Sequence, residues 1–218
     1  MYAEPAGRAT YGHTIGIIMQ HDGPVRLPGD VGNLLTYPFP VTFRVVSDFP
    51  MDAIMTTHLL RYADRFVEAA RDLEATGCKA ITSGCGFLAL LQPVLAEAVR
   101  VPVFASALIQ VPLIAAMLRP DQRIGIITAN ATRLTERHFQ AVGWSSEQYT
   151  VVIAGIEQDL DGDFNRQNLA RMWEDPTVVP NMESCMVRVA RRLIDGDPSI
   201  SALPVSYTHL TLPTILRV

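Results

Sequence analysis

The chain has 218 residues, of which 49% are hydrophobic and 18% charged, a balance that suits a large buried core. Its length fits one large α/β domain or two smaller lobes. A net charge of -4 without a basic run argues against nucleic acid as the main partner. The three cysteines have no regular spacing, which argues against a disulfide framework or a structural zinc site and favours a reduced, cytoplasmic compartment. The first residues do not resemble a signal peptide, and no apolar run is long enough to span a bilayer.

The first half of the chain alternates predicted strands with predicted helices. Apolar runs at residues 14–20 and 41–46 predict two strands, the first of them buried on both faces. The intervening residues 21–33 are dense in Gly, Pro and Asp, which excludes a helix and leaves either a functional loop or a solvated connection. A helix is predicted over residues 51–76, with Gly77 as its stop. The polar side chains that could meet a ligand near this loop are Arg26, Asp30, Asn33 and Thr36.

A thiol flanked by two glycines follows the next predicted strand, in the stretch KAITSGCGFLALL at 79–91. Cys85 lies between Gly84 and Gly86, at the turn from this strand into an apolar helix. Its small neighbours predict an open approach on both sides, and the free N–H groups of a helix N-terminus can lower a thiol pKa or bind an anion. The same residues also fit a small buried cysteine at a tight turn.

A second round of alternation begins after a predicted strand at residues 101–105. Ser106 is expected to cap the next helix, and residues 123–130 repeat the pattern of the first strand, ending in Thr128 and Asn130. The cluster at 159–165 is interpreted as turns, because it lacks the bidentate Glu of a calcium loop. The remaining predicted elements are helices at 107–118, 134–142 and 181–195, and strands at 150–155 and from Ile200.

Strands that alternate with helices predict parallel sheets, and two rounds with similar opening strands predict two lobes. Ligands of such sheets bind beyond the carboxyl ends of the strands. We therefore predict an α/β protein with two stacked, Rossmann-like lobes, in which the loop after Gln20, the Cys85 turn and the Thr128–Asn130 turn surround one cleft that holds the active site. The predicted divisions are residues 1–105, 106–204 and 205–218.

The segment 205–218 does not fit the alternation. Pro204 interrupts the strand that opens at Ile200, and a central strand should not carry proline. The letters VSYTHL resemble one translated frame of a widely used transposon sequencing adapter. We expect the natural coding sequence to end near Leu203 and the rest to be adapter read-through. A native stop codon after the last printed residue, in intact genomic DNA, would contradict this expectation.

The chain resembles the aspartate/glutamate/hydantoin racemase superfamily over residues 14–203. The resemblance rests on TSGCG at 82–86, PGDVGN at 28–33 and RIGIITAN at 123–130. It implies two pseudo-symmetric α/β lobes and cofactor-independent proton transfer at a carbon next to a carboxylate or carbonyl. One cysteine from each lobe would serve, as base on one face of the carbon and acid on the other.

By this resemblance Cys85 matches the first catalytic cysteine, and neither a metal ion nor a cofactor is expected. The second cysteine would fall near Tyr207, inside the segment assigned to the adapter. Neither Cys78 nor Cys185 fits that role, and both are interpreted as core residues. The predicted substrate-binding residues are Gln20, Arg26, Asn33, Ser83, Gly86, Phe87, Thr128, Asn130 and Thr132.

The resemblance predicts an amino-acid or hydantoin racemase, active in the parent protein and weak or inactive in this chain. One alternative is a single-cysteine decarboxylase of a malonate-type acid or a cis–trans isomerase of a diacid. Another is a non-catalytic protein that binds small acids. The expected partners are a small-molecule carboxylate or hydantoin and a second copy of the chain, in a dimer or larger assembly, with no nucleic acid and no membrane.

Overall fold

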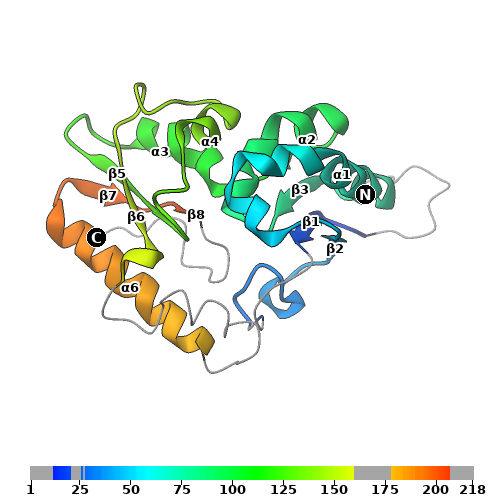
Figure 1. Cartoon of the computed structure of the whole chain (residues 1–218), viewed down its shortest axis with the longest axis horizontal. Coiled ribbons are helices and arrows are strands. Elements are labelled where there is room, and N and C mark those ends of the chain that lie inside the picture. The colour runs from blue at the N-terminus through cyan, green and yellow to red at the C-terminus, as the bar shows by residue number, and fades with distance from the viewer. Residues whose placement is uncertain (1–11, 21–25, 27, 160–177, 207–218) are drawn as a thin grey trace.

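The computed structural model describes residues 12–20, 26, 28–159 and 178–206. The chain forms two α/β lobes that lie side by side (Figure 1). In the first lobe the parallel strands lie in the order β2 (Val41–Val46), β1 (Ile15–Gln20), β3 (Ala80–Ser83) and β4 (Val103–Phe104).

The second lobe repeats this order with its own parallel sheet. Its strands lie in the order β6 (Val151–Gly155), β5 (Arg123–Thr128) and β7 (Ile200–Ala202), and β8 (Val205–Ser206) also pairs with β5. In both lobes the opening strand is central, the second strand lies on one side and the third on the other. The predicted fold class, α/β with two pseudo-symmetric parallel-sheet lobes, is confirmed.

Three predicted helices begin as 3-10 turns. Residues 51–76 form η2 (Met51–Met55), η3 (Thr57–Tyr62) and only then α1 (Ala63–Thr76). The helix after Cys85 is η4 (Gly86–Leu91) followed by α2 (Gln92–Ala98), and the predicted helix at 107–118 is η5 (Ala107–Gln110) followed by α3 (Val111–Met117). The prediction of continuous α-helices is therefore wrong at these N-terminal parts.

Local chemistry explains these breaks and the helix ends. Both α2 and α3 have proline in their first turn, where its missing N–H is tolerated. Because proline cannot donate a backbone hydrogen bond, the α-helical pattern does not continue towards the N-terminus. Thr56 interrupts the first helix with an extended backbone, at φ −137°. As predicted, Gly77 ends α1, in the left-handed region at φ 111°, and Ser106 caps η5.

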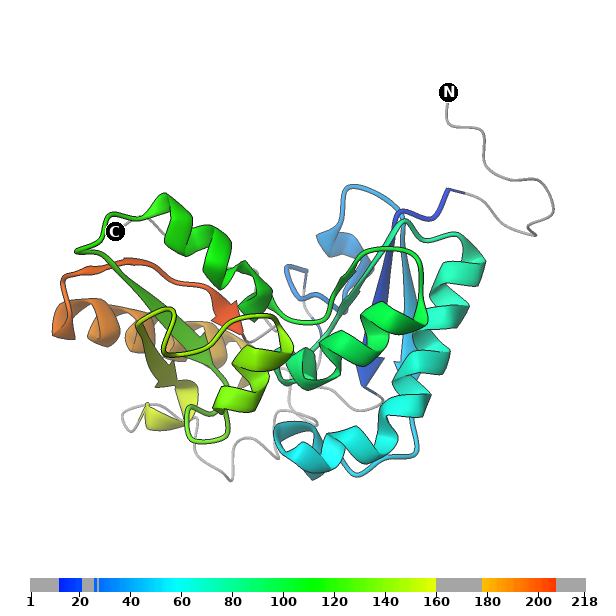
Figure 2. The ribbon, with the colours of Figure 1, turned by 90° about the horizontal axis from the view of Figure 1, so that it is seen from above.

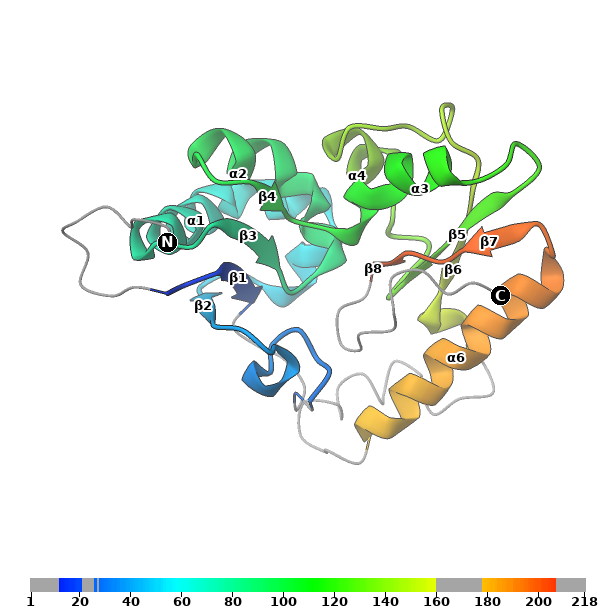
Figure 3. The same cartoon turned by 180° about the vertical axis from the view of Figure 1, so that it is seen from behind.

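Each lobe has its own core, and a third core joins them. In the first lobe α1 packs on β1 and β2 through Phe66 and Leu73, and Leu59 of η3 joins the same core; all three are fully buried. In the second lobe α6 (Val178–Gly196) covers one face of the sheet, opposite α3 and α4 (Glu136–Ala141) (Figure 3). Cys185 is fully buried on the inner face of α6 and Cys78 is 2% exposed, as their core assignment predicted.

The joint core lies where the two lobes meet (Figure 2). Phe87 and Ala89 of η4 pack there with Ile126 of β5. Phe139 of α4 and Trp144, which follows α4, complete this core. The turn that carries Cys85 therefore belongs to the packing of both lobes. The chain passes between them near residue 105, where β4 ends, but the predicted division at that residue stays a prediction.

The edge strand of the second lobe continues beyond Pro204. β7 and β8 both pair with β5, and Ile127 N donates to Pro204 O at 3.2 Å between them. Within the described sheet this strand lies at the edge, where a residue without an N–H is tolerated. Val205 and Ser206 thus extend the strand that opens at Ile200. No helix in the described part of the chain combines the length and apolarity needed to cross a lipid bilayer.

Candidate active site

The Cys85 turn is fixed between two strands of the first sheet. Gly84 N donates to Ile18 O of β1 at 2.9 Å. The Ser83 hydroxyl donates to Ala105 O at 2.5 Å, just after β4, and lies 3.2 Å from Cys85 O. Cys85 caps η4 with an extended backbone, at φ −153°, and its side chain is half-buried. Ser83, one of the predicted binding residues, is thus the anchor of the turn.

The two flanking glycines are required by close packing. A Cβ on Gly84 would lie 2.5 Å from Met19 Sδ, and a Cβ on Gly86 would collide with the backbone and hydroxyl of Ser206. The prediction that small neighbours leave Cys85 open on both sides is therefore wrong. The glycines instead allow β1 and β8 to approach the turn. Through Gly86, the second lobe comes directly against the thiol-bearing segment of the first.

Burial raises the pKa of the Cys85 thiol to about 11. The backbone N–H groups of Phe87 and Leu88 and the positive charge of Arg26 act in the opposite direction without offsetting it. The N–H groups at the start of η4 thus lower the thiol pKa, in the predicted direction, but they do not outweigh desolvation of the thiolate. At neutral pH the resting site therefore holds a protonated thiol.

Arg26 is held by the loop that follows β1. Its Nη1 donates to Asp30 Oδ1 at 2.9 Å, and the two side chains are 16% and 3% exposed. The Asn33 amide is used within the same loop, since Nδ2 donates to Arg26 O at 2.7 Å and Oδ1 accepts from Leu35 N at 2.8 Å. Asn33 thus shapes the loop, whereas Arg26 places a charge close enough to act on Cys85. Residues 21–25 and 27 of the predicted loop lie outside the described residues.

Unpartnered polar atoms gather at the carboxyl ends of three strands. Gln20 Oε1 on β1, Thr128 Oγ1 on β5 and Ser206 Oγ on β8 are buried without a hydrogen-bond partner among the described residues. Gln20 is next to Gly84, Ser206 is against Gly86, and Thr128 is the register partner of Ser206. Leaving such a group unpaired costs about 1–3 kcal/mol, so a cluster of them indicates a place for a polar ligand.

Three other predicted binding residues have local structural roles. Phe87 is 1% exposed and meets His138 edge-on, with ring centroids 5.4 Å apart. Asn130 Oδ1 accepts from Thr132 Oγ1 at 2.7 Å and from Arg133 N at 3.1 Å, and Thr132 is exposed. The contacts above connect Gln20, Gly86 and Thr128 to the Cys85 turn. Those of Asn130 and Thr132 form a separate turn after β5.

Sequence reasoning missed two polar residues at this edge. Ser206 was assigned to a foreign segment, although it directly follows an apolar strand. Glu157 follows β6 in η6 (Ile156–Gln158), where Oε1 accepts from Ala131 N at 2.8 Å and Oε2 is buried without a partner among the described residues. A polar residue at the end of a predicted strand was the available signal. Tyr207 and residues 160–165 of the predicted turn cluster lie outside the described residues.

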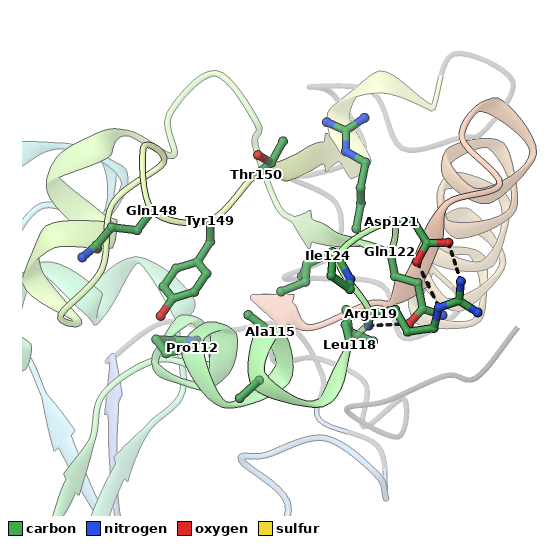
Figure 4. A pocket seen from close by; sticks show the side chains of 13 residues that line it. Pro112, Ala115, Leu118, Arg119, Asp121, Gln122, Ile124, Gln148, Tyr149 and Thr150 are labelled. Carbon is green, nitrogen blue, oxygen red and sulfur yellow. Dashed lines mark hydrogen bonds and ion pairs between the residues drawn. The ribbon is translucent and has the colours of Figure 1, made fainter.

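A surface hollow of about 660 Å³ lies away from this edge, at the amino ends of β5 and β6 (Figure 4). Its polar side chains largely bond to one another. Arg119 Nε donates to Asp121 Oδ1 at 3.1 Å, and Arg119 N donates to Gln122 Oε1 at 2.9 Å. Arg119 and Asp121 form an exposed local pair, and among the described residues the one buried polar atom without a partner in this lining is Arg123 Nε, whereas three such atoms lie around the Cys85 turn.

No protein-family model matches the chain. It is 29% identical over 191 residues to a dimethylsulfoniopropionate lyase of Durusdinium sp. clade D, covering 84% of this chain and 61% of that protein. It is 30% identical over 174 residues to dimethylsulfoniopropionate lyase 3 of Emiliania huxleyi, covering 78% of this chain and 45% of that protein. The chain thus spans less than two thirds of the length of these relatives.

Solved structures share the two-lobe fold. A glycine-to-cysteine mutant of arylmalonate decarboxylase, in a sulfate-associated form, aligns with a TM-score of 0.58 at 18% identity, covering 90% of this chain and 79% of that one. The aspartate racemase of Picrophilus torridus aligns with a TM-score of 0.50 at 11% identity, covering 93% and 84%. At these identities the likeness establishes the fold alone.

Proposed function

We propose that the chain is an enzyme that removes the proton next to the carboxylate of a small acid, with Cys85 as the base. The substrate that we propose is dimethylsulfoniopropionate, cleaved by β-elimination. The observation that carries this proposal is the position of Cys85 at a strand edge where buried hydroxyl and amide oxygens have no partner among the described residues. The names of the relatives, which match most of this chain, supply the substrate.

Dimethylsulfoniopropionate carries a carboxylate at one end and a dimethylsulfonium group two carbons away. The Cys85 thiolate takes the proton from the carbon next to the carboxylate, and the electron pair of that C–H bond forms the new C=C bond. The bond between the β-carbon and sulfur then breaks, and its electron pair leaves with sulfur. The products are acrylate and neutral dimethyl sulfide, and the thiol returns its proton to solvent.

The pKa of the resting thiol, about 11, sets the electrostatic requirement for this step. At pH 7 only about one thiol in 10⁴ is ionised at such a pKa. A sulfonium cation bound near Cys85 favours the thiolate, in the same direction as the charge of Arg26. A cationic substrate would therefore activate its own base, which a neutral or anionic leaving group would not do.

The carboxylate needs hydrogen-bond donors, because removal of the α-proton places further negative charge on its oxygens. The Thr128 hydroxyl is fully buried and unpartnered among the described residues, and we assign it this role. The Gln20 side chain, 8% exposed beside Gly84, is assigned the second contact through its amide N–H, since its Oε1 can only accept a hydrogen bond. Ser206 offers a further hydroxyl in the chain as it stands. That residues 205–218 are adapter read-through stays a prediction.

The number of available thiols distinguishes elimination from racemisation. Racemisation needs an acid on the face opposite the base, whereas dimethyl sulfide leaves as a neutral molecule and needs none. Cys78 and Cys185 are core residues, and the predicted place of a second cysteine, near Tyr207, lies outside the described residues. One thiol suffices for the lyase. A racemase, as the sequence predicts, is the second candidate, supported by the shared two-lobe fold.

The test measures dimethyl sulfide in the headspace and acrylate in solution after the full chain is mixed with dimethylsulfoniopropionate. We expect both products in equal amounts, their loss in Cys85→Ser, and their retention in the matched variant Cys78→Ser. A folded wild-type chain that releases neither product would contradict the lyase.

A second assay tests the racemase. The chain is incubated in D₂O with each enantiomer of aspartate, glutamate and a 5-substituted hydantoin. Washout of the α-proton dependent on Cys85 would establish a racemase in place of the lyase. If both reactions are absent, while Cys85→Ser leaves the affinity for small carboxylates unchanged, the chain is a binding protein.

A further inference from the structure

We propose that Asp30 is a positioning residue of the Cys85 site, which fixes the Arg26 guanidinium where its charge favours the thiolate. The effect on turnover rests on the proposed function, but the effect on the thiol does not. Nothing in the racemase resemblance or in the sequence analysis assigned this role to Asp30. The inference rests on the hydrogen bonds of the loop, on its packing and on the charge at Cys85.

The Asp30 carboxylate is built into the loop rather than exposed on it. Its side chain is 3% exposed, and Oδ1 accepts from Arg26 Nη1 at 2.9 Å and from Gly32 N at 2.6 Å. The Thr36 hydroxyl donates to Asp30 O at 2.6 Å and accepts from Gly29 N at 2.9 Å. Asp30 is therefore held through both its backbone carbonyl and its side chain. Its carboxylate defines where the Arg26 guanidinium lies.

Packing connects this loop to the Cys85 turn. A Cβ on Gly32 would collide with Arg26 Cδ and lie 2.9 Å from Met19 Cε. The same Met19 side chain lies against Gly84, where a Cβ would be 2.5 Å from Sδ. Met19 itself is 5% exposed. The loop, Met19 and the turn thus form one packed unit that fixes the Arg26 side chain on its apolar side.

The groups that act on the thiol have distinct sources. Arg26 supplies the charge, and η4 supplies the N–H groups of Phe87 and Leu88. On the loop, burial together with the Asp30 charge raises the pKa of Tyr37 to about 12, and Tyr37 OH donates to Val31 O at 2.8 Å. Tyr37 therefore stays neutral at working pH, and its hydroxyl is used within the loop.

Two possible roles for Asp30 predict opposite changes in the reactivity of the Cys85 thiol when the carboxylate is removed. A carboxylate that acted on Cys85 by its own charge would disfavour the thiolate, so its removal would make the thiol more reactive. A carboxylate that acts by holding Arg26 has the reverse effect, because its removal lets the guanidinium swing into solvent. A residue that only stabilises the loop would change the melting temperature and leave the thiol reactivity of the folded protein unchanged.

The experiment measures the rate of Cys85 alkylation by iodoacetamide against pH, with the modified cysteine identified by peptide mass mapping. We expect Asp30→Asn to slow alkylation about three- to tenfold below pH 9, as an upward pKa shift of about half to one unit does. Arg26→Met should slow it at least as much, and Arg26→Lys should restore part of the rate. The matched control is Asp121→Asn, which breaks the exposed pair with Arg119 and should change nothing.

A double-mutant cycle isolates the pair. In the Arg26→Met background, Asp30→Asn should have no further effect, because Asp30 acts through Arg26. Faster alkylation in Asp30→Asn, an unchanged rate in the folded variant, or the same slowing without Arg26 would each overturn the proposal. If Asp30→Asn does not fold, Asp30→Glu takes its place, with slower alkylation expected because the longer side chain displaces the guanidinium. Turnover is not needed for any of these outcomes, so failure of the lyase and failure of the positioning role are distinguishable.

Discussion

The two sheets are built alike up to their carboxyl edges, where they differ in chemistry. β1 and β5 are both central, each has an inner glycine, and each packs that glycine against leucine side chains, Leu73 in the first lobe and Leu203 in the second. The strand beside β1 leads into the Cys85 turn. The strand beside β5 leads to Ser206, the last residue that the structure describes.

This difference shows how a repeated framework can support an asymmetric reaction. The first lobe supplies a thiol and a nearby guanidinium, whereas the described part of the second lobe supplies the hydroxyls of Thr128 and Ser206. A base on one side and neutral donors on the other suit removal of one proton from an anchored acid. Pairs of similar substitutions at different places in the molecule test this difference, because we expect them to change activity or stability by different amounts.

The largest expected effect on activity distinguishes the half-buried thiol of Cys85 from the fully buried thiol of Cys185. Cys85→Ser should lower kcat/KM about 10²- to 10⁴-fold, because it removes the base, while Cys185→Ser should leave the rate within a few-fold. Cys185 lies on α6, fully buried in the core of the second lobe and away from the Cys85 turn, and burial and the Asp159 carboxylate raise its pKa to about 12. Product release and thermal unfolding measure both variants. Equal rate losses would mean that the two thiols work together.

The next effect concerns the joint core. Phe87→Ala should reduce the free energy of unfolding by about 3–5 kcal/mol, which raises the unfolded fraction roughly 10²- to 10⁴-fold. Leu113→Ala on α3 removes an apolar side chain that is 65% exposed, and should cost within about 0.5 kcal/mol. Urea denaturation measures both. A small loss for Phe87→Ala would show that the lobes do not depend on their shared packing.

The pH profile tests the raised thiol pKa. Because the base is the deprotonated form and its pKa is about 11, alkylation of Cys85 should accelerate about tenfold per pH unit between pH 7 and 10. The sign for stability is opposite. The raised pKa stabilises the fold below the pKa of the unfolded thiol, and this contribution is lost as pH rises towards 11. A plateau in reactivity near pH 8 would contradict the profile.

The smallest effect compares two threonines at strand ends. Thr128→Val should lower kcat/KM about tenfold or less through weaker binding, while stability stays unchanged or rises by about 1 kcal/mol, because an unpartnered buried hydroxyl is removed. Thr82→Val removes a hydroxyl that donates to Phe104 O at 2.9 Å, so it should cost about 0.5–1.5 kcal/mol and leave the rate unchanged. A stability loss for Thr128→Val would mean that its hydroxyl is already satisfied.

Strands could be predicted from the sequence because a strand buried on both faces leaves a continuous apolar run, as at β1 and β5. The 3-10 segments could not, since spacing of three residues is shared by 3-10 and α-helical periodicity over one or two turns. The place of Cys85 followed from its strand and glycines. Its pKa did not, because desolvation depends on packing by Met19 and Ser206 from distant parts of the chain.

The loop contacts were beyond sequence reasoning for a related reason. The sequence indicates Arg26 and Asp30 as separate polar candidates. Their pairing depends on the turn at Gly32 and on the hydrogen bond from the Thr36 hydroxyl to Asp30 O, which no periodic pattern predicts. The hydroxyl of Thr128 was found because it ends an apolar strand. That it is buried without a partner is a property of the assembled sheet.

The joint core constrains how this molecule can be divided and how it can move. Since Phe87 and Ala89 are buried against the second lobe, a chain cut after residue 105 would expose an apolar surface directly beside the Cys85 turn. Hinge opening between the lobes would break these contacts too, so the packing that joins the lobes also holds the Cys85 turn in place.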